Sequence, residues 1–249
     1  MERRTVERRT VERRTVEESP ARARGVRPLR GIGVLLADWG YVLRHQLRAA
    51  FDRGEPAALV DESGTGEPVI LLPGIYETWR FLHPLARRLH TAGHPVHVVA
   101  ALGDNRMSLQ EAADLVQRHL LENHLGDVTI VAHSKGGLVA RALLARPEVA
   151  ARIRRVVAIS TPFSGSVLAG WIPIPAVRAL RPTGPDFARL AAAETDLSRI
   201  VSIWGWYDPH IPGGCALPGA RNIEVPVGGH FRILGSPRVL ALVDDLTDI

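Results

Sequence analysis

The sequence predicts an α/β protein with a mostly parallel central sheet and helices on both faces of that sheet. Two observations indicate this class. From residue 68 onward, short apolar runs rich in β-branched residues alternate with stretches of helical periodicity. The apolar runs are nearly continuous, which is typical of parallel strands that are buried on both faces. Because chemistry in such sheets collects at the carboxyl ends of the strands, the residues that follow each strand are the candidates for a functional site.

The expected strands and helices alternate along the chain. We expect strands at residues 68–72, 96–100, 128–133, 155–160, 200–204 and 222–225. The spacing of the apolar residues predicts helices at residues 79–92, 108–123, 137–145 and 237–246.

A further helix is expected from about residue 33 to residue 51, before the first strand. Its apolar residues are Leu36, Tyr41, Leu43, Leu47 and Phe51, and its polar residues include Asp38, Arg44, His45 and Arg48. We interpret this segment as a helix packed on the main domain. The basic residues beside Trp39 and Tyr41 leave a peripheral membrane contact as the alternative.

The chain is expected to form one α/β domain at residues 31–249, preceded by a basic tail at residues 1–30. A length of 249 residues suits a single domain of this class. In the tail, Glu-Arg-Arg-Thr-Val occurs three times over residues 2–16. Since a period of five matches neither a helix nor a strand, this segment buries little and is expected to be disordered. An electrostatic tether to anionic lipid or RNA is the alternative role for the repeats.

The positive charge of the chain belongs to this tail. The chain has 31 basic and 26 acidic residues, of which residues 1–30 hold ten arginines and five glutamates. The rest of the chain is therefore neutral, which argues against a nucleic-acid groove on the domain.

Cys215 is the only cysteine, so no disulfide can form within the chain. We expect it to be a small packed or surface residue rather than a nucleophile.

Targeting and cofactor signals are absent from the sequence. No apolar run approaches the roughly 18 residues that a membrane span needs. The N-terminus is charged throughout and has no apolar core of a signal peptide, so a cytoplasmic protein is expected. No cluster has the spacing of metal ligands, and neither a metal nor a cofactor is expected.

The most informative segment is the strand, turn and helix pattern at residues 128–141. The strand ends at Ser134, Lys135 and two glycines follow, and a helix begins there. Such a turn exposes a serine hydroxyl as a nucleophile, with the NH groups of the helix N-terminus directed at the reaction centre. The residues two before and two after the serine must be small, and here they are Ala132 and Gly136. An ordinary turn with an incidental serine is the alternative.

A serine nucleophile needs a base to take its proton and an acid to orient that base. His230 is the predicted base, because it follows the last strand and two glycines let the backbone bring its imidazole inward. Asp208 is the predicted acid, on the loop after the strand at residues 200–204. Pro209 and Pro212 would stiffen that loop and hold the carboxylate still.

Other histidines and acids compete for these roles. His210 is the alternative base, and Glu224 and Asp104 are the alternative acids. His133 adjoins the nucleophile, where a side chain points away from the serine, so a packing role is expected. His83 is expected on the surface of a helix.

Two backbone NH groups are expected to bind the negative charge that develops on a substrate oxygen. One belongs to Lys135, directly after the nucleophile. The second comes from the loop after the first central strand, where Gly74 permits a turn and the NH of Ile75 is the first choice, with Tyr76 next. The side chain of Lys135 either adds positive potential or faces solvent.

Several motifs between residues 66 and 235 form a recognisable set: Leu-Leu-Pro-Gly-Ile, Ala-His-Ser-Lys-Gly-Gly, Ser-Thr-Pro-Phe-Ser-Gly-Ser, Tyr-Asp-Pro-His-Ile-Pro and Gly-Gly-His-Phe. Together they resemble the α/β hydrolases of the bacterial lipase and esterase type. The resemblance implies the α/β-hydrolase fold and hydrolysis of a carboxylic ester through an acyl-serine intermediate, without a cofactor. The resemblance also implies that Ser134, Asp208 and His230 form a catalytic triad. Ala132 departs from the glycine that usually stands there, although one branch of bacterial lipases also has alanine.

An insertion at residues 166–198 usually lies over the active site in this fold. Trp171, Ile172 and Ile174 are expected to line an acyl pocket, to form a short lid or simply to pack. An apolar cover favours hydrophobic, lipid-like acyl esters over charged substrates. A thioesterase, an amidase or an acyltransferase would share the triad. A catalytically silent fold that binds a lipid or a partner protein is the alternative from a different class.

Overall fold

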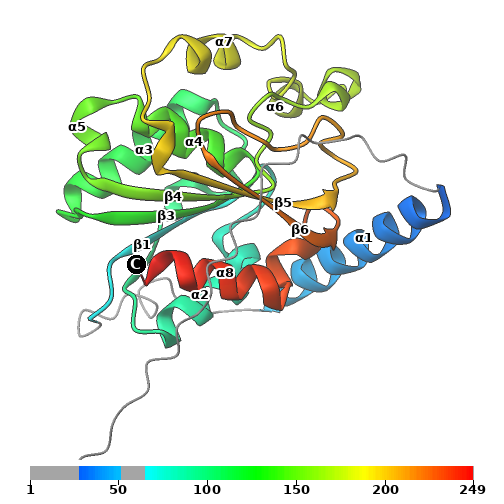
Figure 1. The fold of residues 1–249 in the computed structure, drawn as a ribbon, viewed down its shortest axis with the longest axis horizontal. Coiled ribbons are helices and arrows are strands. Elements are labelled where there is room, and N and C mark those ends of the chain that lie inside the picture. The colour runs from blue at the N-terminus through cyan, green and yellow to red at the C-terminus, as the bar shows by residue number, and fades with distance from the viewer. Residues whose placement is uncertain (1–27, 52–64, 249) are drawn as a thin grey trace, which may run out of the picture.

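The computed structural model describes residues 28–51 and 65–248. Its centre is a six-stranded sheet in the order β2-β1-β3-β4-β5-β6, in which every pair of neighbours is parallel (Figure 1). The strands are β1 (Val69–Leu72), β2 (Val96–Val98), β3 (Val128–His133), β4 (Ile153–Ile159), β5 (Ile200–Tyr207) and β6 (Arg221–Gly228). The predicted parallel sheet is confirmed, and β5 and β6 extend beyond their predicted ranges.

The strands separate two hydrophobic cores. On β1, Ile70 and Leu72 belong to one core and Val69 and Leu71 to the other, because successive side chains point to opposite faces. All four are fully buried. This explains why the strands read as continuous apolar runs rather than as alternating ones.

Helices cover both faces of the sheet, as predicted (Figure 1). The first core packs against α3 (Leu109–Glu122), α4 (Lys135–Leu144), α5 (Pro147–Ala150) and α7 (Pro185–Ala192). The second core includes residues of η2 (Trp79–Leu82), α2 (His83–Thr91), η6 (Arg232–Gly235) and α8 (Pro237–Thr247). A short turn, η3 (Ala100–Leu102), follows β2. Helix α3 begins with a capping box. The side chain of Ser108 accepts the backbone NH of Glu111, and the side chain of Glu111 accepts the backbone NH of Ser108.

Helix α1 (Pro28–Phe51) packs on the domain, partly through Tyr41 and Val42, which lie against the second core. Leu36, Leu43 and Leu47 are exposed, whereas the polar residues Asp38 and His45 are buried. The reason is that both polar side chains have partners on the domain side: Asp38 accepts backbone NH groups, and His45 lies against Phe81, with ring centroids 5.7 Å apart. The helix also begins earlier than expected. The predicted disordered tail lies outside the described residues up to residue 27.

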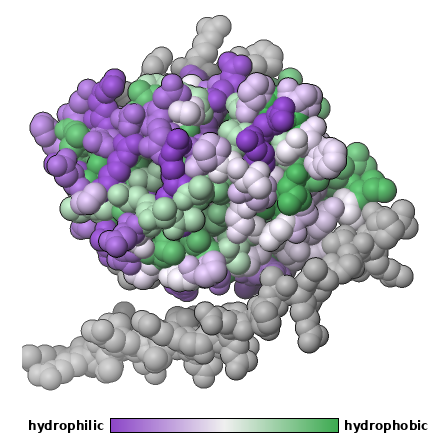
Figure 2. Space-filling model, turned by 90° about the horizontal axis from the view of Figure 1, so that it is seen from above, coloured by the Kyte–Doolittle hydropathy of each residue, from purple (hydrophilic) through white to green (hydrophobic). Residues whose placement is uncertain are grey.

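Residues 166–198 fold as η4 (Val167–Trp171), α6 (Pro175–Arg178), α7 and η5 (Leu197–Arg199). Trp171, Ile172 and Ile174 are exposed. Seen from the side of α6 and α7, the surface carries hydrophobic patches among polar ones (Figure 2). A lid action of this segment stays a prediction.

Within the described residues, no helix combines the length and apolar composition that a membrane crossing requires.

Candidate active site

The turn between β3 and α4 holds Ser134 in a left-handed backbone conformation, with φ 50° and ψ −120°. This conformation is costly for a residue with a side chain and persists only where the surroundings enforce it. A Cβ on Gly136 would collide with the carbonyl oxygen of Leu72, and one on Gly137 would collide with the side chain of Thr161. The two glycines therefore let α4 approach the sheet closely enough to fix the turn.

Three side chains that follow different strands form one hydrogen-bonded chain. The Oγ atom of Ser134, after β3, lies 3.0 Å from Nε2 of His230, after β6. The Nδ1 atom of His230 lies 2.7 Å from Oδ2 of Asp208, after β5. All three residues are buried. The structure thus brings together the three residues that the sequence nominated, in the order nucleophile, base and acid.

The charged groups of this hydrogen-bonded triad stabilise one another. Burial by itself would lower the pKa of His230, but the adjacent carboxylate of Asp208 raises it above its usual value. Burial would raise the pKa of Asp208, but His230 and the hydrogen bonds it receives lower it. The Oδ1 atom of Asp208 accepts the backbone NH groups of His210 at 2.8 Å and Ile211 at 3.1 Å. These bonds fix the carboxylate and keep it ionised.

The backbone of His230 is held on both sides by residues that sequence reasoning missed as site residues. Its NH donates to Asp38 of α1 at 2.9 Å. Its carbonyl oxygen lies 3.0 Å from Nε2 of His133, whose Nδ1 is 2.9 Å from Oε2 of Glu77. The only sequence signals are that Asp38 is the one acid in α1 and that Glu77 lies in the loop after β1.

The loop after β1 carries the candidate oxyanion donors. The NH of Tyr76 donates to the carbonyl oxygen of Asp104 at 2.8 Å, so this alternative donor is engaged elsewhere. The NH of Gly74 donates to Oε2 of Glu77 at 2.8 Å. For the NH groups of Ile75 and Lys135, no protein acceptor is found in the described part of the chain. The arrangement favours these two donors, whose role stays a prediction.

The side chain of Lys135 is buried and does not face solvent. Its Nζ atom donates to the carbonyl oxygens of Asn105 at 2.7 Å and Met107 at 2.5 Å. Asn105 in turn donates through Nδ2 to the carbonyl oxygen of Pro73 at 2.8 Å. Burial lowers the pKa of Lys135 to about 8. The lysine therefore ties the turn after Ser134 to the loop with the candidate oxyanion donors.

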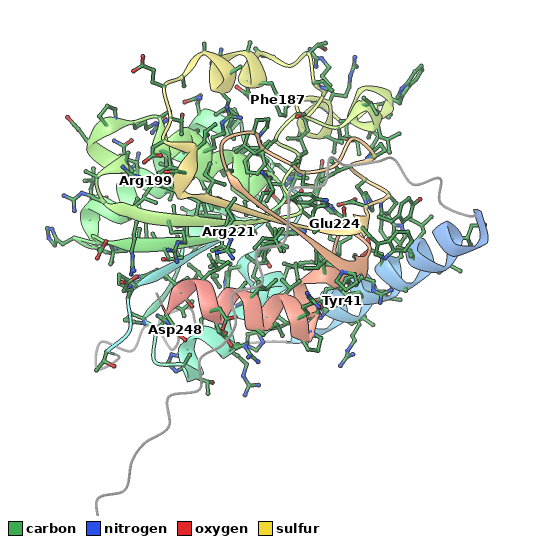
Figure 3. The ribbon with its side chains drawn as sticks, in the orientation of Figure 1. Tyr41, Phe187, Arg199, Arg221, Glu224 and Asp248 are labelled. Atoms are coloured by element: carbon green, nitrogen blue, oxygen red, sulfur yellow. The ribbon has the colours of Figure 1, made fainter. Side chains whose placement is uncertain are left out.

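The competing residues lie outside the chain of hydrogen bonds that contains Ser134. Glu224 is exposed on β6 (Figure 3), and Asp104 pairs with Arg106 at 2.7 Å. His83 is half-buried at the start of α2. The ring of His210 is tilted against that of His230, with ring centroids 5.1 Å apart, and burial lowers the pKa of His210.

One cluster has atoms close enough to ligate a metal ion. Asp208, His210 and His230 each offer one ligand atom, and these atoms lie within 4.8 Å of one another. Asp208 and His230 already bond each other through those groups, and His230 also reaches Ser134. The donor set therefore fits the hydrogen-bonded triad better than a metal centre. Cys215 is buried, and burial raises the pKa of its thiol.

Comparisons with protein families and solved structures find proteins that are similar to this chain. A profile of the PGAP1-like alpha/beta domain family matches residues 102–171, which include the turn at Ser134. Among solved structures, the mature lipase BlEst2 of Bacillus licheniformis matches with a TM-score of 0.57 and 16% identity, covering 76% of this chain and 94% of the lipase. No curated protein sequence matches significantly.

Two further solved structures match over a similar extent. The monoacylglycerol lipase of Paleococcus ferrophilus has a TM-score of 0.52 and 17% identity, covering 73% of this chain and 95% of that one. The enol-lactonase of Burkholderia xenovorans has a TM-score of 0.51 and 15% identity, covering 76% and 93%. At these identities the likeness shows the fold alone, and the chemistry has to be argued from the site.

Proposed function

We propose that this chain, which has the α/β-hydrolase fold, is a serine hydrolase that cleaves carboxylic esters with hydrophobic acyl groups. The observation that carries the proposal is the buried chain of two hydrogen bonds from Ser134 through His230 to Asp208. A lipase of Bacillus licheniformis and a monoacylglycerol lipase of Paleococcus ferrophilus are among the proteins with the same fold.

In the proposed reaction, Oγ of Ser134 attacks the ester carbonyl carbon while its proton passes to Nε2 of His230. The carbonyl oxygen becomes an oxyanion, which the NH groups of Ile75 and Lys135 stabilise. Each such donor contributes about 3–4 kcal/mol to the transition state. The proton on His230 then passes to the leaving alkoxide, which departs as the alcohol and leaves an acyl-serine. Water, activated by the same imidazole, releases the acid and restores the hydroxyl.

A carboxylate at Asp208 supports this cycle because it stabilises the imidazolium that forms in both halves. Its low pKa keeps it charged while His230 gains and loses a proton. The preference for hydrophobic acyl groups rests on the apolar side chains that the segment 167–174 exposes. This segment follows Ser166, whose hydroxyl donates to the carbonyl oxygen of His210 near the triad. A thioesterase or an acyltransferase would use the same residues.

The test is labelling with a fluorophosphonate probe, which reacts with an activated serine. We expect the wild-type protein to be labelled and Ser134→Ala to lose labelling. Ser160→Ala is a matched control, because Ser160 is also a buried serine at the end of a strand with a left-handed φ of 47°. Folded wild-type protein that takes no label would support the catalytically silent alternative instead. A series of esters, thioesters and amides of increasing acyl length then ranks the remaining activities.

A further inference from the structure

Helix α1 places a carboxylate against the turn that carries His230. The side chain of Asp38 is fully buried. Its two oxygens accept three successive backbone NH groups: that of His230 at 2.9 Å, that of Phe231 at 2.8 Å and that of Arg232 at 2.8 Å. Hydrogen bonds to an ionised acceptor are about twice as strong as neutral ones. The carboxylate therefore fixes the backbone at the residue that presents the imidazole to Ser134.

Glycines in and next to this turn leave room for side chains of α1. A Cβ at Gly228 would lie 2.9 Å from Val34, and one at Gly229 would lie 2.6 Å from Oδ1 of Asp38. Gly229 also has a φ of +108°, which side chains rarely allow. Tyr41, one helical turn further, lies against Gly235 in the same way and points from α1 toward the start of α8 (Figure 3). The close fit recurs at helical spacing along α1, so the helix and the turn form one unit.

We propose that Asp38 is a positioning residue for His230, holding the turn at residues 229–232 so that the imidazole reaches Ser134. Packing alone does not require a carboxylate, since burying an ionised group is costly unless its oxygens are bonded. Here all three bonds converge on the base and the two residues after it. This proposal rests on the proposed function, because it assigns Asp38 to the same reaction.

The test compares Asp38→Asn with the wild-type protein in ester hydrolysis. An amide keeps the shape of the side chain but replaces one acceptor oxygen by a donor that faces backbone NH groups. We expect kcat to fall about 10- to 100-fold, with little change in KM, because a base displaced by a fraction of an ångström loses rate rather than affinity. Asp244→Asn is the matched control, since it removes a carboxylate that pairs with Arg88 of α2.

The pH profile separates positioning from general stability. Several groups face His230: Asp208 and His210 from the loop after β5, His133 from β3, Glu77 from the loop after β1 and Asp38 from α1. Burial lowers the pKa of His230, and the carboxylates among these groups raise it. Removing the charge of Asp38 should move the acid limb of kcat/KM to lower pH. If Asp38→Asn is folded, keeps the wild-type kcat and leaves the acid limb of kcat/KM at the same pH, the positioning role of Asp38 is overturned. The proposed function is unaffected by that result. A wild-type protein without activity or labelling overturns the proposed function, and this inference with it.

A separate observation concerns the outer face of the same helix. Ile32, Leu36, Trp39, Leu43 and Leu47 recur at spacings of three and four residues and are all more than half exposed, Leu36 by 69% and Leu43 by 62%. An apolar face of this width is unusual on a helix that is otherwise packed on its domain. His210 links this face to the segment 167–174: its ring lies near Trp39, with ring centroids 6.3 Å apart, and its carbonyl oxygen accepts a hydrogen bond from Ser166.

The exposed charged residues of the two segments that form this face are arginines. In α1 the only acid is Asp38, which is buried, while Arg44 is exposed. Residues 166–182 contain no acidic residue, and Arg178 is exposed. The sequence before the helix, residues 1–27, adds nine arginines and five glutamates. An apolar face whose two segments expose arginines and no carboxylate complements an anionic lipid surface. A second copy across a two-fold axis would instead bring the same arginines against one another.

We infer that the outer face of α1, together with residues 167–174, docks on an anionic lipid surface. The test is co-sedimentation with vesicles of phosphatidylcholine mixed with phosphatidylglycerol, and with vesicles of phosphatidylcholine alone. The triple variant Leu36→Ser, Leu43→Ser and Leu47→Ser should bind the anionic vesicles at least about tenfold more weakly, because it removes three apolar side chains from the face that would enter the lipid. Leu121→Ser is the control, because Leu121 on α3 is also exposed, by 42%, but outside this face.

This measurement needs no turnover, so its result is independent of the proposed function. The variants retain residues 1–30, so electrostatic binding by that segment alone would persist in the triple variant and overturn the inference. Equal binding to both kinds of vesicle overturns the anionic preference. A wild-type dimer in gel filtration that the triple variant converts to a monomer would show that a second copy covers the face instead.

Discussion

Glu77 and His133 are joined by a buried hydrogen bond of 2.9 Å between Oε2 and Nδ1. The same Oε2 atom accepts the NH of Gly74, in the loop with the candidate oxyanion donors. The other ring nitrogen of His133 bonds the carbonyl oxygen of His230. One carboxylate thus connects the loop that would bind the oxyanion to the residue that would act as the base.

The first prediction concerns this connection. Both carboxylate oxygens of Glu77 lie within 2.9 Å of Nδ1 of His133, so in Glu77→Gln the amide nitrogen must face either this ring or the NH of Gly74. We expect a loss of about 1–3 kcal/mol in the free energy of unfolding and a lower kcat. Urea denaturation and initial rates of ester hydrolysis measure the two effects. Glu224→Gln, on the exposed side of β6, is the control and should change neither. Wild-type stability and rate in Glu77→Gln would contradict this role.

The second prediction concerns the acid of the triad. Asp208→Asn should lower kcat by about 10⁴-fold while changing KM little, because the imidazolium loses its counter-charge and the imidazole its orientation. Steady-state kinetics at saturating and limiting ester separate the two constants. Full activity in the variant would show that another residue is the acid.

The third prediction is the pH dependence of the wild-type reaction. The base must be neutral to accept the proton of Ser134, and Asp208 raises the pKa of His230 after burial has lowered it. The acid limb of kcat/KM should therefore have its midpoint above the ordinary histidine pKa of about 6.5. Initial rates across the pH range with an uncharged ester measure it. A midpoint below the ordinary value would mean that burial outweighs the carboxylate.

Most of the fold could be predicted from the sequence because its signals are local. The strands are marked by continuous apolar runs, and the turn at Ser134 is marked by the glycines next to it. Gly136 illustrates this: its neighbours in sequence indicate the turn, and the structure adds only the reason, which is the nearby backbone of Leu72. The positions of Asp208 and His230 followed from strand ends in a parallel sheet.

The residues that hold the site together could not be predicted in this way. Asp38 and His230 are 192 residues apart, and nothing near either of them signals the contact. The apolar pattern of α1 did not identify its inner face, because the buried side chains include the polar Asp38 and His45, whereas Leu36, Leu43 and Leu47 are exposed. Lys135 was equally ambiguous, since its burial depends on two carbonyl oxygens in a loop about 30 residues earlier.

The last prediction uses Lys135, which is the only lysine in the chain. Protein labelled with ¹³C-lysine should give one side-chain signal, and its titration should have a midpoint near the lowered pKa of about 8. An unfolded lysine titrates at about 10.4, so between these values the unfolded state binds more protons than the folded state. The free energy of unfolding of the wild-type protein, relative to Lys135→Met, should therefore rise as the pH is raised from about 8 toward 10. A difference that stays flat, with a midpoint near the ordinary value, would mean that the ammonium group is hydrated and does not tie the two loops together.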